Sequence, residues 1–180
     1  MSKLKSILRY CLFIFALSTL LCSCRNKEVT KALIYQGPMS EHENVLMHYT
    51  ENDRVKAILK AKKIFQFQNG DEEFPEGIYL EFFDKAGKMT STLRANSAYH
   101  FKNENKWRGR GKVEIKNIDK NQQLNSEELF WFPGTRKIST DKFVTITDAE
   151  GVVYGTGLEA LEDMSTYHIK NITGNRDIVD

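Results

Sequence analysis

The chain has 180 residues, a length that suits one domain, and its 26 basic and 24 acidic side chains give a formal net charge of +2. A chain this close to neutral gives no support to nucleic-acid binding, which depends on an excess of Lys and Arg. All three cysteines, Cys11, Cys22 and Cys24, lie near the N-terminus. The rest of the chain therefore has no thiol from which to form a disulfide.

Residues 1–24 are predicted to be a lipoprotein signal segment that lies outside the fold. Three positive charges precede an uncharged, mostly apolar run of 14 residues, Tyr10 to Ser23. A helix of that length spans about 21 Å, against about 30 Å for the hydrocarbon core of a bilayer. The run is therefore short for a transmembrane helix and typical of a signal peptide. Cleavage would remove Lys3, Lys5 and Arg9 and take the net charge from +2 to about −1.

The segment ends in Leu21-Cys22-Ser23-Cys24, which resembles the bacterial lipobox. The resemblance implies cleavage before Cys24 and acylation of Cys24, which would then be the lipid anchor. An ordinary cleaved signal peptide and a short uncleaved anchor are the alternatives. Residues 25–40 are mostly polar, contain a Gly37-Pro38 break and are interpreted as a tether, so that the folded domain begins near Glu41.

From Glu41 onward the dominant pattern is the alternation of apolar and polar residues that is typical of half-buried strands. Alternating runs occur at 65–68, 78–82, 113–116 and 144–147. Segments rich in turn-forming residues lie at 69–71, 84–87, 119–121, 133–134 and 148–151. This spacing predicts antiparallel strands joined by short loops.

Residues 55–65 are compatible with two structures. Val55, Ile58 and Leu59 fit helical spacing, whereas Val55, Ala57, Leu59 and Ala61 alternate as they would in a strand. A strand is predicted, because the neighbouring segments are strand-like and no residue caps a helix.

A loose repeat with a period of 31 residues relates Phe82, Val113 and Val144. Each unit is an alternating strand, a polar turn and a returning strand, and the returning strands are predicted at 91–95, 124–129 and 152–158. Repeats of one supersecondary unit usually share a continuous core. The prediction is an all-β protein in which hairpin-like strand pairs form a folded sheet, sandwich or jellyroll. Chance similarity among hairpins is the alternative.

Five segments between Gly87 and Gly157 together resemble the LptC family, the periplasmic lipopolysaccharide-export components of Gram-negative envelopes. They are 93–99 (LRANSAY), 107–115 (WRGRGKVEI), 124–129 (LNSEEL), 138–146 (ISTDKFVTI) and 155–158 (GTGL). Each motif alone is weakly specific, and their order and spacing carry the resemblance. It extends over residues 41–174 and implies an antiparallel β-jellyroll there, followed by a tail at 175–180.

The same resemblance implies a transport role without chemistry. The domain would take lipopolysaccharide from an inner-membrane ABC transporter whose permease subunits are LptF and LptG. It would hold the acyl chains in an apolar interior and pass the lipid to LptA. The protein would lie in the periplasm, held through its N-terminus at a membrane, which is expected to be the inner membrane.

The predicted lipid-binding interior consists of apolar and aromatic side chains at alternating strand positions, which could bury acyl chains by the hydrophobic effect. For any one of these residues, an ordinary closed core is the alternative. The set is Leu59, Phe65, Phe67, Leu80, Phe82, Leu93, Val113, Ile115, Leu129, Trp131, Val144, Ile146, Tyr154 and Leu158.

The two ends of the sheet are the expected partner surfaces, because an open strand edge presents unpaired backbone groups. By resemblance, the strand at Val45–Tyr49 would face the transporter. The strand that contains Tyr167, Ile169 and Ile172 would face LptA.

A locally basic segment could lie near the lipid phosphates, and a solvated strand face is the alternative. It contains Lys102, Lys106, Arg108, Arg110 and Lys112.

The sequence contains no recognised catalytic or metal-binding motif. The four histidines, His42, His48, His100 and His168, have no ligand spacing. Gly109-x-Gly111 and Gly155-x-Gly157 are interpreted as strand glycines at a bulge or a close backbone approach. Neither enzymatic activity nor a cofactor or metal is expected. The alternatives to lipid transport are a structural or adhesin-like β-repeat lipoprotein without a ligand, and a small enzyme with an unrecognised site.

Overall fold

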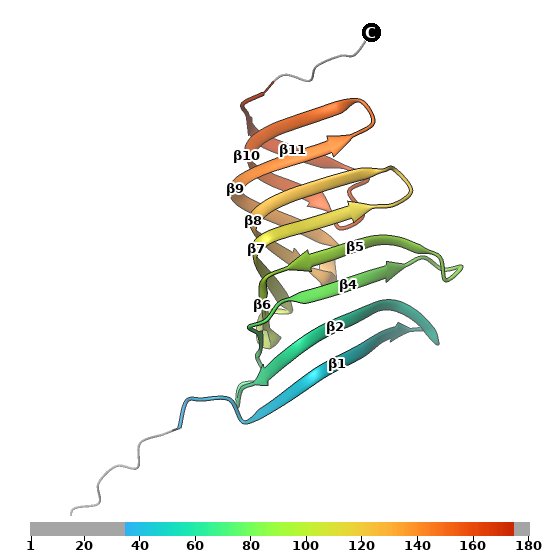
Figure 1. Cartoon of the computed structure of the whole chain (residues 1–180). Helices are drawn as coiled ribbons and strands as arrows, with labels where there is room; N and C mark the ends of the chain where they lie inside the picture. Colours follow the sequence, from blue (N-terminus) through green and yellow to red (C-terminus); the bar gives the residue numbers. More distant parts are fainter. Residues whose placement is uncertain (1–34, 175–180) are drawn as a thin grey trace, which may run out of the picture. The chain divides into compact units, whose positions relative to one another are not determined.

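The computed structural model describes residues 35–174, whose regular structure is almost entirely antiparallel β (Figure 1). The strands are β1 (Ser40–Glu51), β2 (Arg54–Gln66), β3 (Glu72–Phe74), β4 (Ile78–Phe83), β5 (Met89–Ala95), β6 (Ser97–Phe101), β7 (Lys106–Asn117), β8 (Gln122–Phe132), β9 (Lys137–Asp148), β10 (Gly151–Leu161) and β11 (Tyr167–Ile172). Two single-turn 3-10 helices, η2 (Lys102–Glu104) and η3 (Pro133–Thr135), form turns. Among the described residues, no helix has the length and apolar character needed to span a membrane. The predicted signal segment with Cys24, most of the predicted tether and the tail at 175–180 lie outside the described residues.

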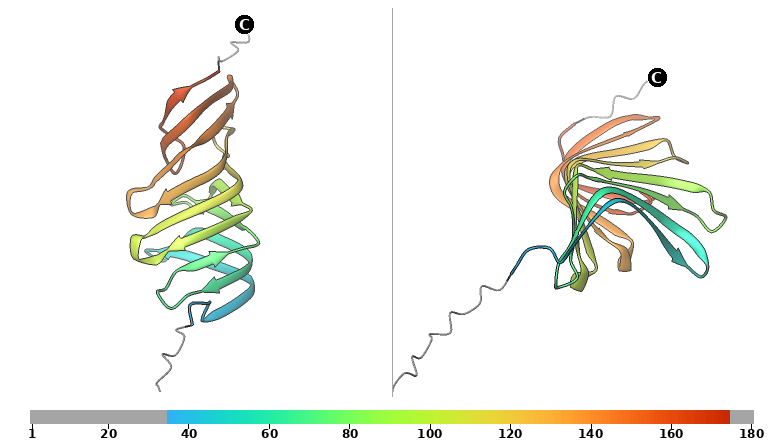
Figure 2. Two further views of the ribbon diagram at one scale, coloured as in Figure 1. Left: turned by 90° about the vertical axis from the view of Figure 1, so that its left-hand side faces the viewer. Right: turned by 60° about the horizontal axis from the view of Figure 1, so that its bottom comes forward.

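Within residues 35–174 the strands form one antiparallel sheet that folds back on itself (Figure 2). The second half of β7 pairs with β5, where Ile115 faces Leu93, and its first half pairs with β6, where Gly109 faces Ala98. β2 is shared in the same way between β4 and β3. The sheet therefore has two layers. The first contains β4 and β5, the second contains β3 and β6, and the long strands run through both.

The long strands pass between the layers at interruptions of the hydrogen-bonded ladder. The register of β7 shifts at Gly111 and Lys112, which have φ of 71° and 47°, and that of β10 shifts at Gly157, with φ of 79°. Residues with positive φ interrupt a strand and increase its twist, as in a β-bulge. Gly155 is required for a different reason, which is the close approach of β11. A Cβ at this position would lie 2.3 Å from Cγ2 of Ile169 on β11. The predicted roles of these glycines, a bulge or a close approach, are confirmed.

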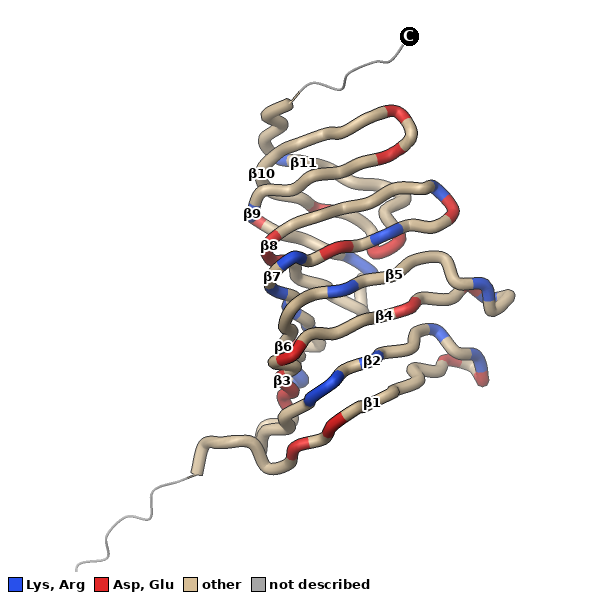
Figure 3. The backbone as a smooth tube through the Cα atoms, viewed as in Figure 1, with Lys and Arg blue, Asp and Glu red and all other residues tan. Residues whose placement is uncertain are grey.

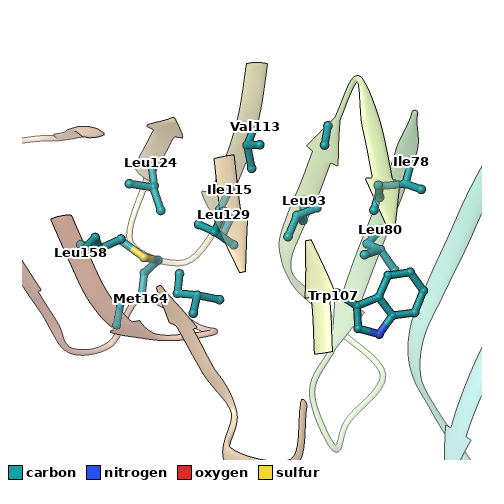
Figure 4. Packing of buried hydrophobic residues seen from close by; sticks show 14 of the residues in the cluster. Ile78, Leu80, Leu93, Trp107, Val113, Ile115, Leu124, Leu129, Leu158 and Met164 are labelled. Carbon is teal, nitrogen blue, oxygen red and sulfur yellow. The ribbon is translucent and has the colours of Figure 1, made fainter. Parts of the chain in front are cut away.

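The core lies between the two layers, and the alternation of each strand selects its members. In β2, for example, Ala57, Leu59 and Ala61 are buried whereas Lys60 is exposed. Figure 4 shows side chains from several strands converging on this space. The largest fully buried side chains are Phe74, Leu59, Ile64, Leu80, Leu124, Leu129, Ile138, Ile146, Leu158, Met164, Val113 and Val144.

The predicted fold class, an all-β protein with a jellyroll-like antiparallel sheet, is confirmed. Residues 55–65 lie in β2 rather than in a helix, as predicted, and the three returning strands lie within β5, β8 and β10. The sequence analysis did not identify β3 as a strand, because its three residues are too few to show an alternating pattern.

Candidate functional site

The candidate site is the apolar interior between the two layers. Of the fourteen predicted interior side chains, nine are buried: Leu59, Leu80, Leu93, Val113, Ile115, Leu129, Val144, Ile146 and Leu158. Phe82 and Trp131 are partly buried and pack against this cluster. Phe65 and Phe67 are half-buried. That these residues bind lipid stays a prediction.

The prediction is wrong for Tyr154, whose side chain is 39% exposed. Its neighbour Val153 packs against the core, and alternation along β10 therefore turns Tyr154 to the outer face. There its ring stacks on that of Phe143, with 6.3 Å between the centroids. In β2 the interior place is taken by Ile64, which is 1% exposed, rather than by the adjacent Phe65.

Several core residues were not predicted from the alternating runs. Phe74 lies on the short strand β3, and Met164 lies in the turn between β10 and β11, where no periodic pattern exists. Trp107, Leu124 and Ile138 lie on strands whose motifs were recognised. Their burial follows from the alternation of those strands, so this signal was available in the sequence.

Aromatic side chains connect the two layers within the interior. The ring of Phe82, on β4, meets that of Trp131, on β8, edge-on with centroids 5.6 Å apart. Trp131 lies 6.1 Å from Trp107, which lies 5.4 Å from Phe74. Aromatic contacts of this kind add packing energy beyond the area that they bury. The interior is therefore a continuous apolar space bounded by both layers.

A partly buried contact between an imidazole and a carboxylate flanks this aromatic group. The ring of His100 stacks on that of Trp107 at 4.3 Å, and its Nδ1 lies 3.1 Å from Oε2 of Glu72. Gln66 Nε2 donates to the other carboxylate oxygen of Glu72 at 3.1 Å. The hydrogen bond with His100 lowers the pKa of Glu72, and it outweighs burial, which acts in the opposite direction.

The turn at residues 162–166, between β10 and β11, closes the interior at one side. Met164 enters the core and is 1% exposed. Asn117, at the end of β7, donates from Nδ2 to the backbone oxygen of Asp163 at 2.7 Å. Trp131 Nε1 donates to Oε2 of Glu162 at 2.8 Å. We call residues 162–166 the closing turn. Through these two hydrogen bonds the turn contacts both the end of β7, in the first layer, and Trp131, whose ring lies within the interior.

The interior is filled in this structure. The void between the layers has a volume of about 10 Å³ and is lined by Ile78, Leu80, Leu93, Trp107 and Leu129, among others. A space of that size holds about one water molecule. This void is too small for an acyl chain, which could occupy it only if the two layers separate.

The interior reaches the surface at β1. Val45, Met47 and Tyr49 lie opposite the buried Ala61, Leu59 and Ala57 of β2. Val45 and Met47 are partly buried, and Tyr49 is 39% exposed. Burial, together with the nearby Glu72 carboxylate, raises the pKa of Tyr49 to about 12.

The two predicted partner strands are the edges of the sheet. Among the described strands, β1 pairs only with β2, and β11 pairs only with β10. On β11, Ile169 is buried in the core, Tyr167 is half-buried and Ile172 is 64% exposed. Each edge therefore has one side that no other described strand covers, and partner binding at these edges stays a prediction.

Much of the predicted basic segment is already paired. Lys106 bonds to Glu104 and Arg110 bonds to Glu128. Arg108 lies over the ring of Phe101, 5.5 Å from its centroid. These contacts favour a folded, solvated strand face for most of the segment. Between residues 35 and 174, no group of three or more His, Cys, Asp or Glu side chains could hold a metal ion.

One comparison with known proteins gives a match. A family model described as lipopolysaccharide-assembly, LptC-related, matches residues 14–175 of the chain. No curated protein matches it.

Proposed function

Since the chain belongs to the LptC family of lipopolysaccharide-assembly proteins, we propose that its interior binds the acyl chains of lipopolysaccharide and relays the lipid from an inner-membrane ABC transporter to LptA. Family membership confirms the resemblance found in the sequence, and it assigns the chain a role in lipopolysaccharide transport. The family is one of transport components, not of enzymes.

The observation that carries the proposal is the continuity of the apolar interior. One cluster contains buried hydrophobic residues from β2 through β11, and Val45 and Met47 of β1 pack against it. The apolar space thus runs from one edge strand to the other. Burial of a few hundred Å² of acyl chain in such a space is worth roughly several kcal/mol, at about 25 cal/mol per Å².

Because the interior is filled, binding requires the layers to move apart. Incoming acyl chains would replace contacts between the layers with contacts to lipid, so that apolar surface stays covered throughout. The polar contacts of the closing turn, such as that of Asn117 with Asp163, would break in this step. The sheet would remain continuous through its bends, where the long strands join the layers.

The proposed partners would bind at the two edges of the sheet. LptF and LptG would meet β1, where the interior reaches the surface, and LptA would add to β11. The protein would work in the periplasm, held at the inner membrane by its N-terminal segment, through Cys24 if that residue is acylated. The open backbone edges of β1 and β11 support this arrangement.

One observation favours the structural alternative, a β-repeat lipoprotein without a ligand. A fully packed interior is what a scaffold domain would have, and the void of about 10 Å³ fits that description. The two functions differ in whether lipid ever reaches the interior.

Photo-crosslinking of the full-length protein distinguishes them. A benzophenone-bearing phenylalanine placed at the partly buried Phe82 should form an adduct with purified lipopolysaccharide. The matched control carries the benzophenone-bearing phenylalanine at Phe143, an aromatic position on the outer face that is 53% exposed. This control should form little adduct with lipopolysaccharide. Absence of an adduct at position 82 in a correctly folded protein would favour the scaffold.

A further inference from the structure

A groove of about 700 Å³ lies at the bends of the sheet, on the outside of the core. Its lining includes Asn44 and Lys112, two non-glycine residues with positive φ, together with Gly77 and Asn96. These residues mark the places where β1 and β7 bend and where the chain enters β4 and passes from β5 to β6. The groove thus exists because the hydrogen-bonded ladder is interrupted in successive elements at the same place.

The rim of this groove, which we call the bend groove, is basic. It carries Lys60, Lys62, Arg94 and Lys112, against a single acidic residue, Glu76. Figure 3 shows Lys and Arg recurring along β2, β5 and β7.

Two of these four cationic side chains form ion pairs with carboxylates, and the other two do not. Lys60 pairs with Glu81 at 2.6 Å, and Arg94 pairs with Glu114 at 3.0 Å. Lys62 and Lys112 are exposed and have no ion-pair or hydrogen-bond partner for their side chains among residues 35–174. Two uncompensated ammonium groups on one groove leave a local positive charge, which favours an anionic ligand.

The floor of the bend groove is apolar and adjoins the interior. It includes Val45, Ala61, Ile78 and Ala95, of which the last three are buried members of the core. Ile78 also lines the void between the layers. The side chain of Ile78 thus lies between the cationic surface groove and the void in the proposed acyl-chain space.

We infer that the bend groove binds the phosphate-bearing headgroup of the amphiphile whose acyl chains occupy the interior. This inference rests on the proposed function, and it adds to it a second subsite with different chemistry. Ammonium groups form charge-assisted hydrogen bonds to phosphate oxygens. Lys62 and Lys112 would supply these bonds, and the apolar floor would receive the first methylene groups of the lipid.

The test measures the affinity of the full-length protein, in a neutral detergent, for two lipids. One is lipopolysaccharide, and the other is the same preparation after enzymatic removal of its lipid phosphates. The wild type should bind the phosphorylated form about tenfold more tightly, and high salt should reduce this preference. The double variants Lys62→Glu/Lys112→Glu and Lys62→Gln/Lys112→Gln should lose the preference while they retain the binding of the dephosphorylated lipid.

The matched control is Lys137→Glu/Lys142→Glu, which reverses two exposed lysines of β9 outside the groove and should keep the preference. Equal affinity of the wild type for both lipids would overturn the headgroup site and leave the proposed function intact. Failure of the wild type to bind either lipid would overturn the proposed function itself.

Inorganic phosphate at matched ionic strength should compete at least a hundredfold less well than the lipid. Equal competition would identify a site for free phosphate and overturn the headgroup assignment.

Discussion

At the scale of single residues, the contact of Glu72 with His100 lies beside the interior aromatics, because the His100 ring stacks on that of Trp107. Both side chains are largely buried, at 17% and 12% exposure. A carboxylate in such a place depends strongly on its hydrogen bonds, because it has lost most of its water. Here Gln66 and the stacked Trp107 hold the two partners in position. The pair therefore couples the stability of the second layer to pH.

We predict that Glu72→Gln lowers the free energy of unfolding by about 1.5–3 kcal/mol at pH 7, the usual range for a hydrogen bond to a charged group. The pKa of Glu72 is lowered in the folded protein, so the folded state binds fewer protons than the unfolded state. The carboxylate therefore stabilises the fold above its ordinary pKa, and this contribution is lost as the pH falls through the lowered value. Urea denaturation at pH 7 and pH 3 measures the effect, and the gap between variant and wild type should narrow at pH 3.

The control for this prediction is Glu104→Gln, which removes an exposed partner of Lys106. Exposed ion pairs contribute little, so this variant should unfold like the wild type at both pH values. A gap for Glu72→Gln that is as wide at pH 3 as at pH 7 would show that its cause is not the loss of the charge.

At the scale of elements, β11 combines two roles on one short strand. Its buried Ile169 packs into the core beside Gly155, while its outer backbone edge pairs with no other described strand. Exposed edges usually carry charged residues that prevent aggregation. Lys170 serves this purpose here and pairs with Asp141 of β9. β11 is thus held firmly by its side chains while its edge stays available.

We predict that deletion of residues from 167 onward abolishes binding to LptA and leaves the capture of lipid from the transporter largely intact. The reason is that strand addition requires the backbone of β11, whereas most of the interior comes from β2 to β10. Pull-down of LptA and co-purification of lipid measure the two functions separately.

Deletion also removes Ile169 from the core, and truncation of a buried Ile typically costs about 2–5 kcal/mol. The matched control is therefore Ile169→Ala in the full-length protein, which loses this packing and keeps the edge. It should still bind LptA. Normal binding of LptA by the deletion variant would place the contact elsewhere and contradict the edge-to-edge arrangement.

At the scale of the whole domain, the sheet is continuous at its bends and is closed at one side by the closing turn. The bends keep the layers joined by covalent strands, whereas the turn holds them through hydrogen bonds and the packing of Met164. Contacts of the second kind open at a lower free energy than the strand ladders do. The closing turn is therefore the place where separation of the layers would begin.

We predict that Asn117→Asp speeds amide hydrogen exchange at residues 162–166 with little change in the rest of the domain. Aspartate keeps the oxygen that accepts from the backbone N–H of Lys120. It loses the donor to the backbone oxygen of Asp163 and places a negative charge near that oxygen. Hydrogen exchange followed by mass spectrometry measures the change. Asn125→Asp, the same substitution on β8, is the control, and unchanged exchange in Asn117→Asp would show that this bond does not hold the turn.

Local patterns were sufficient for most of the fold. Alternation at 78–82 and 144–147 predicted strands, because a strand with one face in the core repeats every two residues. The sequence did not reveal which residues of each alternating run point into the core after the strand bends. In β2 the buried positions change from Leu59 and Ala61 to Ile64, so that Ile64 rather than Phe65 lies in the core. In β10 the register shift at Gly157 moves the alternation by one residue, so that Val153 rather than Tyr154 lies on the same face as the core.

By itself, the sequence determined the fold class, the strands with regular alternation and the family, since each of these depends on local residue order. Only the tertiary structure decided how full the interior is, which turn closes it, and that Lys62 and Lys112 share a groove. The pair is 50 positions apart in the chain, and no local pattern relates the two residues. They line one groove because β4 and β5 connect β2 to β7 in the sheet, and that arrangement follows from long-range strand pairing and packing.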